Sequence, residues 1–130
     1  MSLNDPLANV LSHILIEDRK GKRQIVVRNN SRLIKAVLNL LKDNNYLGEI
    51  KEIEDGKGGV LEINLLGAIN KTGVIKPRYR VAASEYKKFE KRYLPAFGFG
   101  LLIVSTNKGM MTQESAVKNN LGGKLIAYVY

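Results

Sequence analysis

A cluster of hydrogen-bonding side chains follows a short apolar run in the last third of the sequence. The run is Leu101–Val104, and apolar and β-branched residues in this pattern are typical of a buried strand. The cluster comprises Ser105, Thr106, Asn107, Lys108 and Gly109. Two hydroxyls, an amide and an ammonium group together suit ribose hydroxyls, base edges in a shallow groove and phosphates. The same residue types are common in ordinary turns, so the cluster alone favours neither a binding site nor a plain turn.

Catalytic chemistry finds little support among the other reactive side chains. The single histidine, His13, lies beside the apolar stripe of a predicted helix, where a structural place is more common than a catalytic one. Neither an HExxH nor a CxxC pattern is present, and GFGLLI lacks the third glycine of a dinucleotide-binding loop. An esterase-like role for Ser105 would need a base, and none is near in the sequence. We therefore predict a protein that is not an enzyme and needs neither cofactor nor metal.

The uneven distribution of charge is the strongest signal in the composition. Residues 1–66 hold 10 basic and 9 acidic side chains, whereas residues 67–130 hold 11 basic and 3 acidic ones. A strongly basic half of this kind predicts a polyanionic partner, and nucleic acid is the usual one. A basic surface that only aids solubility is the plainer alternative. The sequence has no cysteine, which excludes disulfides and thiolate metal sites. It also has no apolar run of the roughly 20 residues that a membrane-spanning helix needs, so no membrane partner is expected.

The segment YKKFEKRY combines aromatic rings with cations at helical spacing. Tyr86, Phe89 and Tyr93 recur at i, i+3 and i+7, which favours a core-facing stripe over a base-stacking platform. Tyr86, at the start of the helix, could still stack on a base. Lys88 and its neighbouring cations are candidate phosphate contacts, or else a solvated helix face.

The elements that position these residues predict an α+β protein of two small lobes. Residues 1–66 are predicted to form an N-terminal α-β-α-β-β lobe: a helix at 6–17 capped by Asp5, a strand at 24–28, a helix capped by Ser31, and a hairpin around DGKGG. Residues 66–76 look like a crossover. Residues 67–130 are predicted to form a basic, strand-rich, RNA-binding lobe with short helices. Its predicted elements are a strand in KPRYRVA, a helix in SEYKKFEKRY, the strand ending at Thr106, a helix capped by Thr112 that follows the polar cluster, and a final strand KLIAYVY.

Three stretches together resemble one protein family. STNKGMMTQESAVKNNLGGKLIAYVY resembles the C-terminal signature of the family of ribosomal protein eight of the small subunit. NDPLANVLSHI resembles the first helix of that family, and NNSRLIKAVLNLLKDNNYLGEI its second helix and following strand. The resemblance spans essentially the whole chain. The long crossover and KPRYRVAASEY look like the archaeal branch of the family.

The resemblance implies a cytoplasmic structural component of the small ribosomal subunit. It would bind the central domain of small-subunit ribosomal RNA directly, help its assembly, and lie beside other small-subunit proteins without a small-molecule substrate. A translational regulator that binds a similar element in messenger RNA is the alternative. At positions that match the family, the resemblance implies RNA contacts from the STN turn, from the paired glycines and from Tyr86. It implies secondary contacts from the start of the first helix and from the Ser31 turn. These residues are Ser105, Thr106, Asn107, Tyr86, Gly122, Gly123, Asn4, Asp5, Asn9 and Ser31.

Three residues depart from the pattern of the family. Asn107 stands where bacterial members usually carry serine, and its amide keeps a donor and an acceptor while reaching further. Lys124 replaces an acidic residue, so it becomes a candidate phosphate contact. Asn120 stands where glycine is frequent, and asparagine can still adopt the left-handed conformation.

Overall fold

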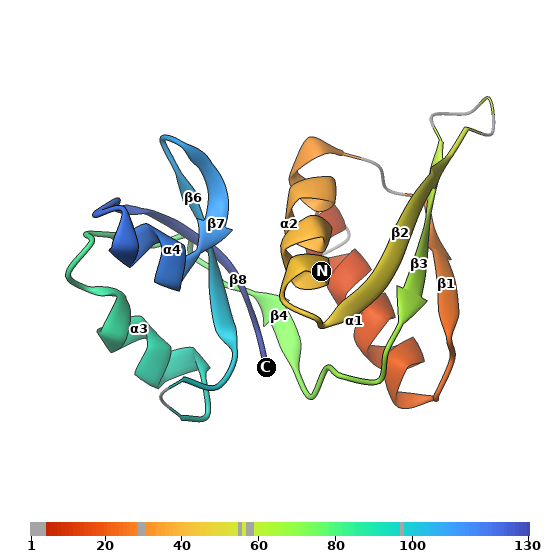
Figure 1. Cartoon of the computed structure of the whole chain (residues 1–130), viewed down its shortest axis with the longest axis horizontal. Coiled ribbons are helices and arrows are strands. Elements are labelled where there is room, and N and C mark those ends of the chain that lie inside the picture. The colour runs from red at the N-terminus through yellow and green to blue at the C-terminus, as the bar shows by residue number, and fades with distance from the viewer. Residues whose placement is uncertain (1–4, 29–30, 55, 57–58, 97) are drawn as a thin grey trace. The chain divides into compact units, whose positions relative to one another are not determined.

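The computed structural model describes residues 5–28, 31–54, 56, 59–96 and 98–130. The chain divides into two compact units, residues 1–70 and 71–130, which we call unit 1 and unit 2 (Figure 1). Among the described residues, each unit contains one antiparallel sheet and two helices, so the predicted α+β class with two lobes is confirmed. The predicted domain boundary between residues 66 and 67 stays a prediction.

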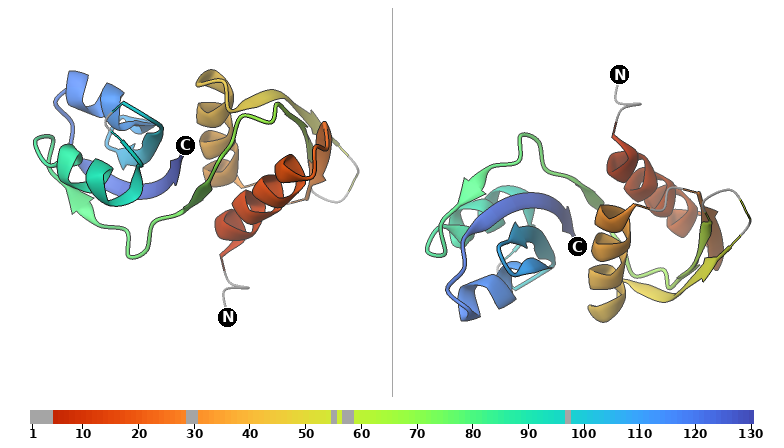
Figure 2. Two further views of the ribbon diagram at one scale, coloured as in Figure 1. Left: turned by 90° about the horizontal axis from the view of Figure 1, so that it is seen from below. Right: turned by 90° about the horizontal axis from the view of Figure 1, so that it is seen from above.

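Unit 1 has the predicted order of elements. Helices α1 (Pro6–Arg19) and α2 (Arg32–Asp43) lie on the same side of a three-stranded sheet (Figures 1 and 2). The sheet has the order β1-β3-β2, with β1 at Gln24–Val27, β2 at Leu47–Ile53 and β3 at Val60–Leu65. Alternate residues of β1 are buried, as expected of a strand with one face on a core. The predicted hairpin is confirmed by the β2–β3 pairing, although part of DGKGG falls outside the described residues.

Side-chain caps explain where the helices of unit 1 begin. The Asp5 carboxylate accepts a hydrogen bond from the Ala8 amide at 3.1 Å, and proline follows at the first helical position. The Ser31 hydroxyl accepts from the Ile34 amide at 3.2 Å. Each cap satisfies an amide that the helix itself leaves without a partner. Both predicted caps are therefore confirmed.

Unit 2 is organised around its last strand, β8, which curves through the unit in both views of Figure 2. Strands β4 and β5 pair with β8 along one edge, β6 pairs with the other edge, and β7 pairs with β6. The elements are β4 (Thr72–Val74), β5 (Arg80–Val81), α3 (Tyr86–Tyr93), β6 (Leu101–Thr106), β7 (Gly109–Thr112), α4 (Gln113–Lys118) and β8 (Gly123–Val129).

Three features of unit 2 differ from the prediction. The predicted crossover at 66–76 contains β4, which only three residues form and which depends on pairing with β8. The strand predicted over KPRYRVA is reduced to the two residues whose register on β8 is regular, although the Tyr79 carbonyl oxygen also accepts a hydrogen bond from the Leu125 amide of β8. The polar cluster does not lead straight into a helix: β7 comes between, so the cluster is the tip of a β6–β7 hairpin. The predicted cap of the following helix, Thr112, is confirmed by its hydrogen bond from the Ser115 amide at 3.3 Å.

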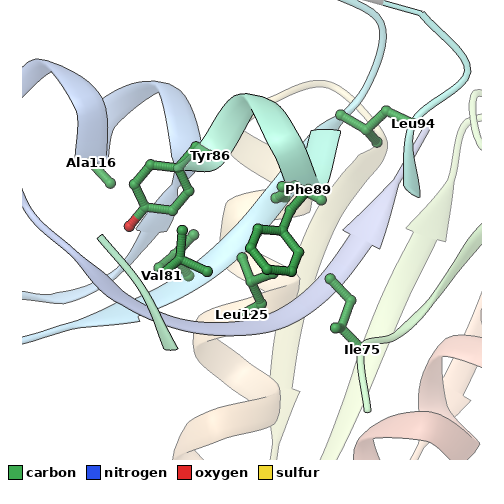
Figure 3. Packing of buried hydrophobic residues seen from close by; sticks show 9 residues of the cluster. Ile75, Val81, Tyr86, Phe89, Leu94, Ala116 and Leu125 are labelled. Atoms are coloured by element: carbon green, nitrogen blue, oxygen red, sulfur yellow. The ribbon is translucent and has the colours of Figure 1, made fainter. Parts of the chain in front are cut away.

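The core of unit 2 lies between its sheet and its helices. Figure 3 shows Tyr86 and Phe89 of α3 pointing at Val81 and Leu125 of the sheet, with Ala116 of α4 alongside. All five are buried, so the prediction that the aromatics of α3 form a core-facing stripe is confirmed for the first two rings. This packing fixes the ends of β5 and β8, from which the candidate site is built.

Candidate nucleic-acid interface

An open groove of about 620 Å³ lies in unit 2 where β5 and β6 flank the start of β8. Six of the predicted binding residues line it. They come together because β6 and β8 are antiparallel, so the end of β6 lies beside the start of β8. Four further residues, from β5 and the segment leading to α3, complete it. The lining residues are Arg80, Val81, Ala82, Glu85, Ser105, Thr106, Asn107, Gly122, Gly123 and Lys124.

A row of three polar side chains crosses the three strands at this groove. Lys124 of β8 is paired with Arg80 on one side and with Ser105 on the other. Residues directly opposite in antiparallel strands point to the same face, with Cβ atoms about 5 Å apart. Two cations so placed repel each other, and neither has an ion pair among the described residues. The row is an exposed positive site whose repulsion an anion would relieve.

The polar cluster at the hairpin tip divides into bound and available side chains. The Thr106 hydroxyl donates to the Gly109 carbonyl oxygen at 2.8 Å and accepts from the Lys108 amide at 3.1 Å, so it closes the turn. Within the described residues, neither Ser105 nor Asn107 makes a side-chain hydrogen bond. Because successive strand residues point to opposite faces, Ser105 and Thr106 do not face the same way. Ser105, Asn107 and the exposed ammonium of Lys108 are thus the side chains of the cluster that are available to a ligand.

Two glycines permit the close pairing that forms the floor of the groove. A Cβ on Gly123 would collide with the Ser105 carbonyl oxygen and lie 2.8 Å from a methyl carbon of Val104. A Cβ on Gly122 would lie 2.7 Å from the Val81 carbonyl oxygen. The lack of a side chain at both positions is required by the chain's own neighbouring strands. Close approach of RNA to Gly122 and Gly123 stays a prediction.

Tyr86 holds this floor from beneath. Tyr86 is 2% exposed. Its hydroxyl donates a hydrogen bond of 2.9 Å to the carbonyl oxygen of Leu121, the residue directly before the two glycines. Burial raises the pKa of the Tyr86 hydroxyl, because the phenolate would be poorly solvated there. A ring so enclosed offers no face to a base, so the predicted stacking of Tyr86 on RNA is corrected to a positioning role.

One carboxylate lies among the cations of the groove. Glu85 comes just before α3, and its Oε1 accepts a hydrogen bond from the Ala82 amide at 2.9 Å. A carboxylate repels phosphate but accepts hydrogen bonds from hydroxyl and amino groups. The groove therefore presents cations at Arg80 and Lys124 and an acceptor at Glu85, which suits a ligand bearing both phosphates and hydrogen-bond donors.

The other predicted contacts lie outside the lining of this groove. Lys108 and Gly109 are exposed at the hairpin tip, next to Asn107. Lys88 is exposed on α3, with its ammonium 5.8 Å from the centroid of the Phe89 ring. In unit 1, Asn9 is exposed on α1 and Ser31 caps α2, whereas Asn4 falls outside the described residues. Their contacts with RNA stay predictions.

Arg80 and Glu85 were not singled out from the sequence. The alternation of Arg78 and Arg80 with Tyr79 and Val81 is typical of a strand with both arginines on one face, which is a usable signal. The register of β5 on β8, which sets Arg80 beside Lys124, depends on long-range pairing that no local pattern encodes.

The described residues hold no group of three or more side chains that could bind a metal ion. Among them, too, no helix combines the length and apolar character that crossing a membrane requires. The single histidine, His13, is exposed on α1 in unit 1.

Comparison with known families agrees with this surface. The family model of Ribosomal protein S8 matches residues 5–130, which is nearly the whole chain. Members of this family are non-enzymatic structural proteins of the ribosome, which acts in the cytoplasm, and their partners are ribosomal RNA and other components of the small subunit. The chain belongs to the ribosomal protein S8 family, and is thus a small-subunit protein that binds the central domain of 16S ribosomal RNA.

Proposed function

We propose that unit 2 supplies the principal RNA-binding surface of this protein and that the groove is its selective part. The observation that carries the proposal is the row Arg80–Lys124–Ser105, in which two unneutralised cations stand beside a free hydroxyl. Such an arrangement costs stability in the free protein, so a bound anion is its simplest explanation.

Each part of the groove has a role in this proposal. Arg80 and Lys124 would meet phosphates, which supply most of the affinity and make it sensitive to salt. Ser105 and Asn107 would bond to 2′-hydroxyls and base edges in the wide, shallow minor groove of an RNA helix. Glu85 would accept a hydrogen bond from a 2′-hydroxyl or an exocyclic amino group. Selectivity then follows from the shape of the helix and from these few acceptors and donors.

Unit 1 would add secondary contacts through the exposed side chains of Asn9 and Ser31. We also propose that the chain belongs to the archaeal branch of the family, on the strength of KPRYRVAASEY. That placement is checked by comparing full family sequences, and grouping with bacterial members would contradict it. Direct contacts with neighbouring small-subunit proteins, a role in assembly, and the absence of a small-molecule substrate are part of the same proposal.

The test of the groove is a filter-binding titration of the full chain with a central-domain RNA fragment. We expect Ser105→Ala combined with Asn107→Ala to weaken binding by about 1–3 kcal/mol for each well-formed polar interaction that the substitutions remove. The matched control is Ser12→Ala combined with Asn39→Ala, which removes the same groups from exposed helix positions of unit 1. Equal affinities of the two double variants would contradict the proposal.

A further inference from the structure

Unit 2 has a second pocket that the groove does not include. It measures about 330 Å³ and is formed by the end of α3, the end of β8 and the residue that precedes β4. Of its seven lining residues among those described, three are tyrosines, two are cations and none is acidic. The lining residues are Lys71, Arg92, Tyr93, Leu94, Pro95, Tyr128 and Tyr130.

The three tyrosine rings form a nearly parallel series. The Tyr93 and Tyr128 centroids are 5.6 Å apart with the planes inclined by 26°, and Tyr128 and Tyr130 are 6.4 Å apart and inclined by 24°. Gly73 of β4 lies against the middle ring, since a Cβ there would come within 3.0–3.2 Å of three Tyr128 atoms. Each ring is only partly buried. The series is thus held in place on one side while part of its aromatic surface stays accessible.

The two cations that line the pocket are held by contacts within unit 2. Lys71 exchanges two backbone hydrogen bonds with Tyr130, at 3.0 and 2.9 Å. The Arg92 guanidinium lies 5.4 Å from the centroid of Phe89 and 5.8 Å from that of Tyr79. Neither cation has an ion pair within the described part of the chain. Glu90, the acidic residue of α3, instead accepts a hydrogen bond of 2.9 Å from the side-chain amide of Gln113.

We propose that this pocket binds an unpaired nucleotide of RNA, separate from the segment held by the groove. Its base would stack on the accessible tyrosine surface, and the adjoining phosphates would meet Lys71 and Arg92. Aromatic rings interleaved with unpaired cations suit a nucleotide, because every base has a π-face and every nucleotide carries a phosphate. The inference rests on RNA binding by the family but not on the groove.

The test measures binding of the full chain to the central-domain RNA fragment for paired substitutions. Tyr93→Leu and Tyr130→Leu each remove a ring, and we expect affinity to fall about fivefold or more for each. Tyr93→Phe and Tyr130→Phe keep the ring and should bind like the parent chain. Lys71→Gln should lower the salt dependence of binding, whereas Lys118→Gln, at an exposed position of α4, should not. Ultraviolet cross-linking of the parent complex should join RNA to residues 93, 128 or 130.

Several results would overturn the inference. Leu variants that bind RNA like the parent chain would do so, as would Leu and Phe variants that weaken binding equally. A pocket that serves a neighbouring protein would give normal RNA binding by the Leu variants and loss of that protein from reconstituted subunits. The double variant at Ser105 and Asn107 keeps the two proposals apart. If it binds normally while Tyr93→Leu does not, the groove proposal fails and this one stands.

Discussion

Unit 1 holds 10 basic and 9 acidic residues, whereas unit 2 holds 11 basic and 3 acidic ones. Some cations of unit 1 form ion pairs: Lys22 lies 2.8 Å from Glu17, and Lys35 lies 2.8 Å from Glu52. In unit 2 Arg80 and Lys124 stand opposite each other without an ion pair among the described residues. Both units are small antiparallel sheets with two helices, so the fold does not dictate this difference. The arrangement of charge in unit 2 is better explained by a polyanionic partner than by stability.

The largest effect is expected where a glycine is required by a neighbouring strand. Gly123→Ala should lower the free energy of unfolding by about 1–3 kcal/mol, because the added methyl pushes β8 away from Ser105. It should also weaken RNA binding, since the same shift opens the groove. Gly48→Ala is the counterpart in unit 1, where the nearest atom would lie 3.0 Å away, and it should cost less stability and no affinity. Urea unfolding and RNA titration of both variants measure the difference, and equal costs would contradict this account.

Neutralising the cation pair should move stability and affinity in opposite directions. Arg80→Gln combined with Lys124→Gln should raise the free energy of unfolding by about 0.2–1 kcal/mol, because like charges face each other there. Binding should weaken, and the slope of log affinity against log salt should fall by about 0.7–0.9 for each phosphate that is no longer neutralised. Arg32→Gln combined with Lys42→Gln on α2 is the control and should leave the slope unchanged. An unaltered slope in the first variant would place these cations outside the interface.

A smaller effect is expected from the buried hydroxyl under the groove. Tyr86→Phe removes the hydrogen bond to the Leu121 carbonyl oxygen and should cost about 0.5–1.5 kcal/mol of stability. Affinity should fall modestly with an unchanged salt slope, since the substitution changes no charged side chain. Tyr46→Phe in unit 1 is the matched control, because within the described residues the Tyr46 hydroxyl has no hydrogen-bond partner. Thermal unfolding and RNA titration check the result. A Tyr86→Phe variant with the stability and the RNA affinity of the parent chain would contradict the positioning role of Tyr86.

The smallest effect concerns the paired charges of unit 1. The hydrogen bond from Lys22 lowers the pKa of Glu17, with the charges of Lys22 and Lys20 acting in the same direction. A carboxyl with a lowered pKa in the folded state stabilises the protein above its unfolded pKa, about 4.3, and this contribution is lost as pH falls. Glu17→Gln should therefore narrow the difference in melting temperature between pH 6 and pH 3, and should leave RNA binding at pH 7 unchanged. If the Glu17→Gln variant shows the same difference in melting temperature between pH 6 and pH 3 as the parent chain, the ion pair of Glu17 with Lys22 contributes nothing to stability.

Local patterns predicted much of the fold and part of the site. The caps at Asp5, Ser31 and Thr112 and the apolar run Leu101–Val104 carry their signals within a few residues, and all four are found where predicted. The polar cluster and the two glycines meet because β6 and β8 pair, and both strands could be recognised from their own sequences.

What could not be predicted depends on contacts between distant segments. Strands β4 and β5 have three and two residues, too few to show a period, and they exist through their pairing with β8. The burial of Tyr86 follows from the position of α3 on the sheet. The use of the Thr106 hydroxyl within its own turn follows from β7, whose Gly-Met-Met-Thr sequence gave no strand signal.

The most direct measurement is amide hydrogen exchange of the full chain with and without the central-domain RNA fragment. We expect RNA to slow exchange most in residues 80–85, 105–109 and 121–124, which form and flank the groove of unit 2. Residues 35–54 of unit 1, which include the ion pair of Lys35 with Glu52 and lie outside the groove, should change little. Slowed exchange confined to unit 1, with residues 105–109 and 121–124 unaltered, would contradict the central claim that the groove binds the RNA.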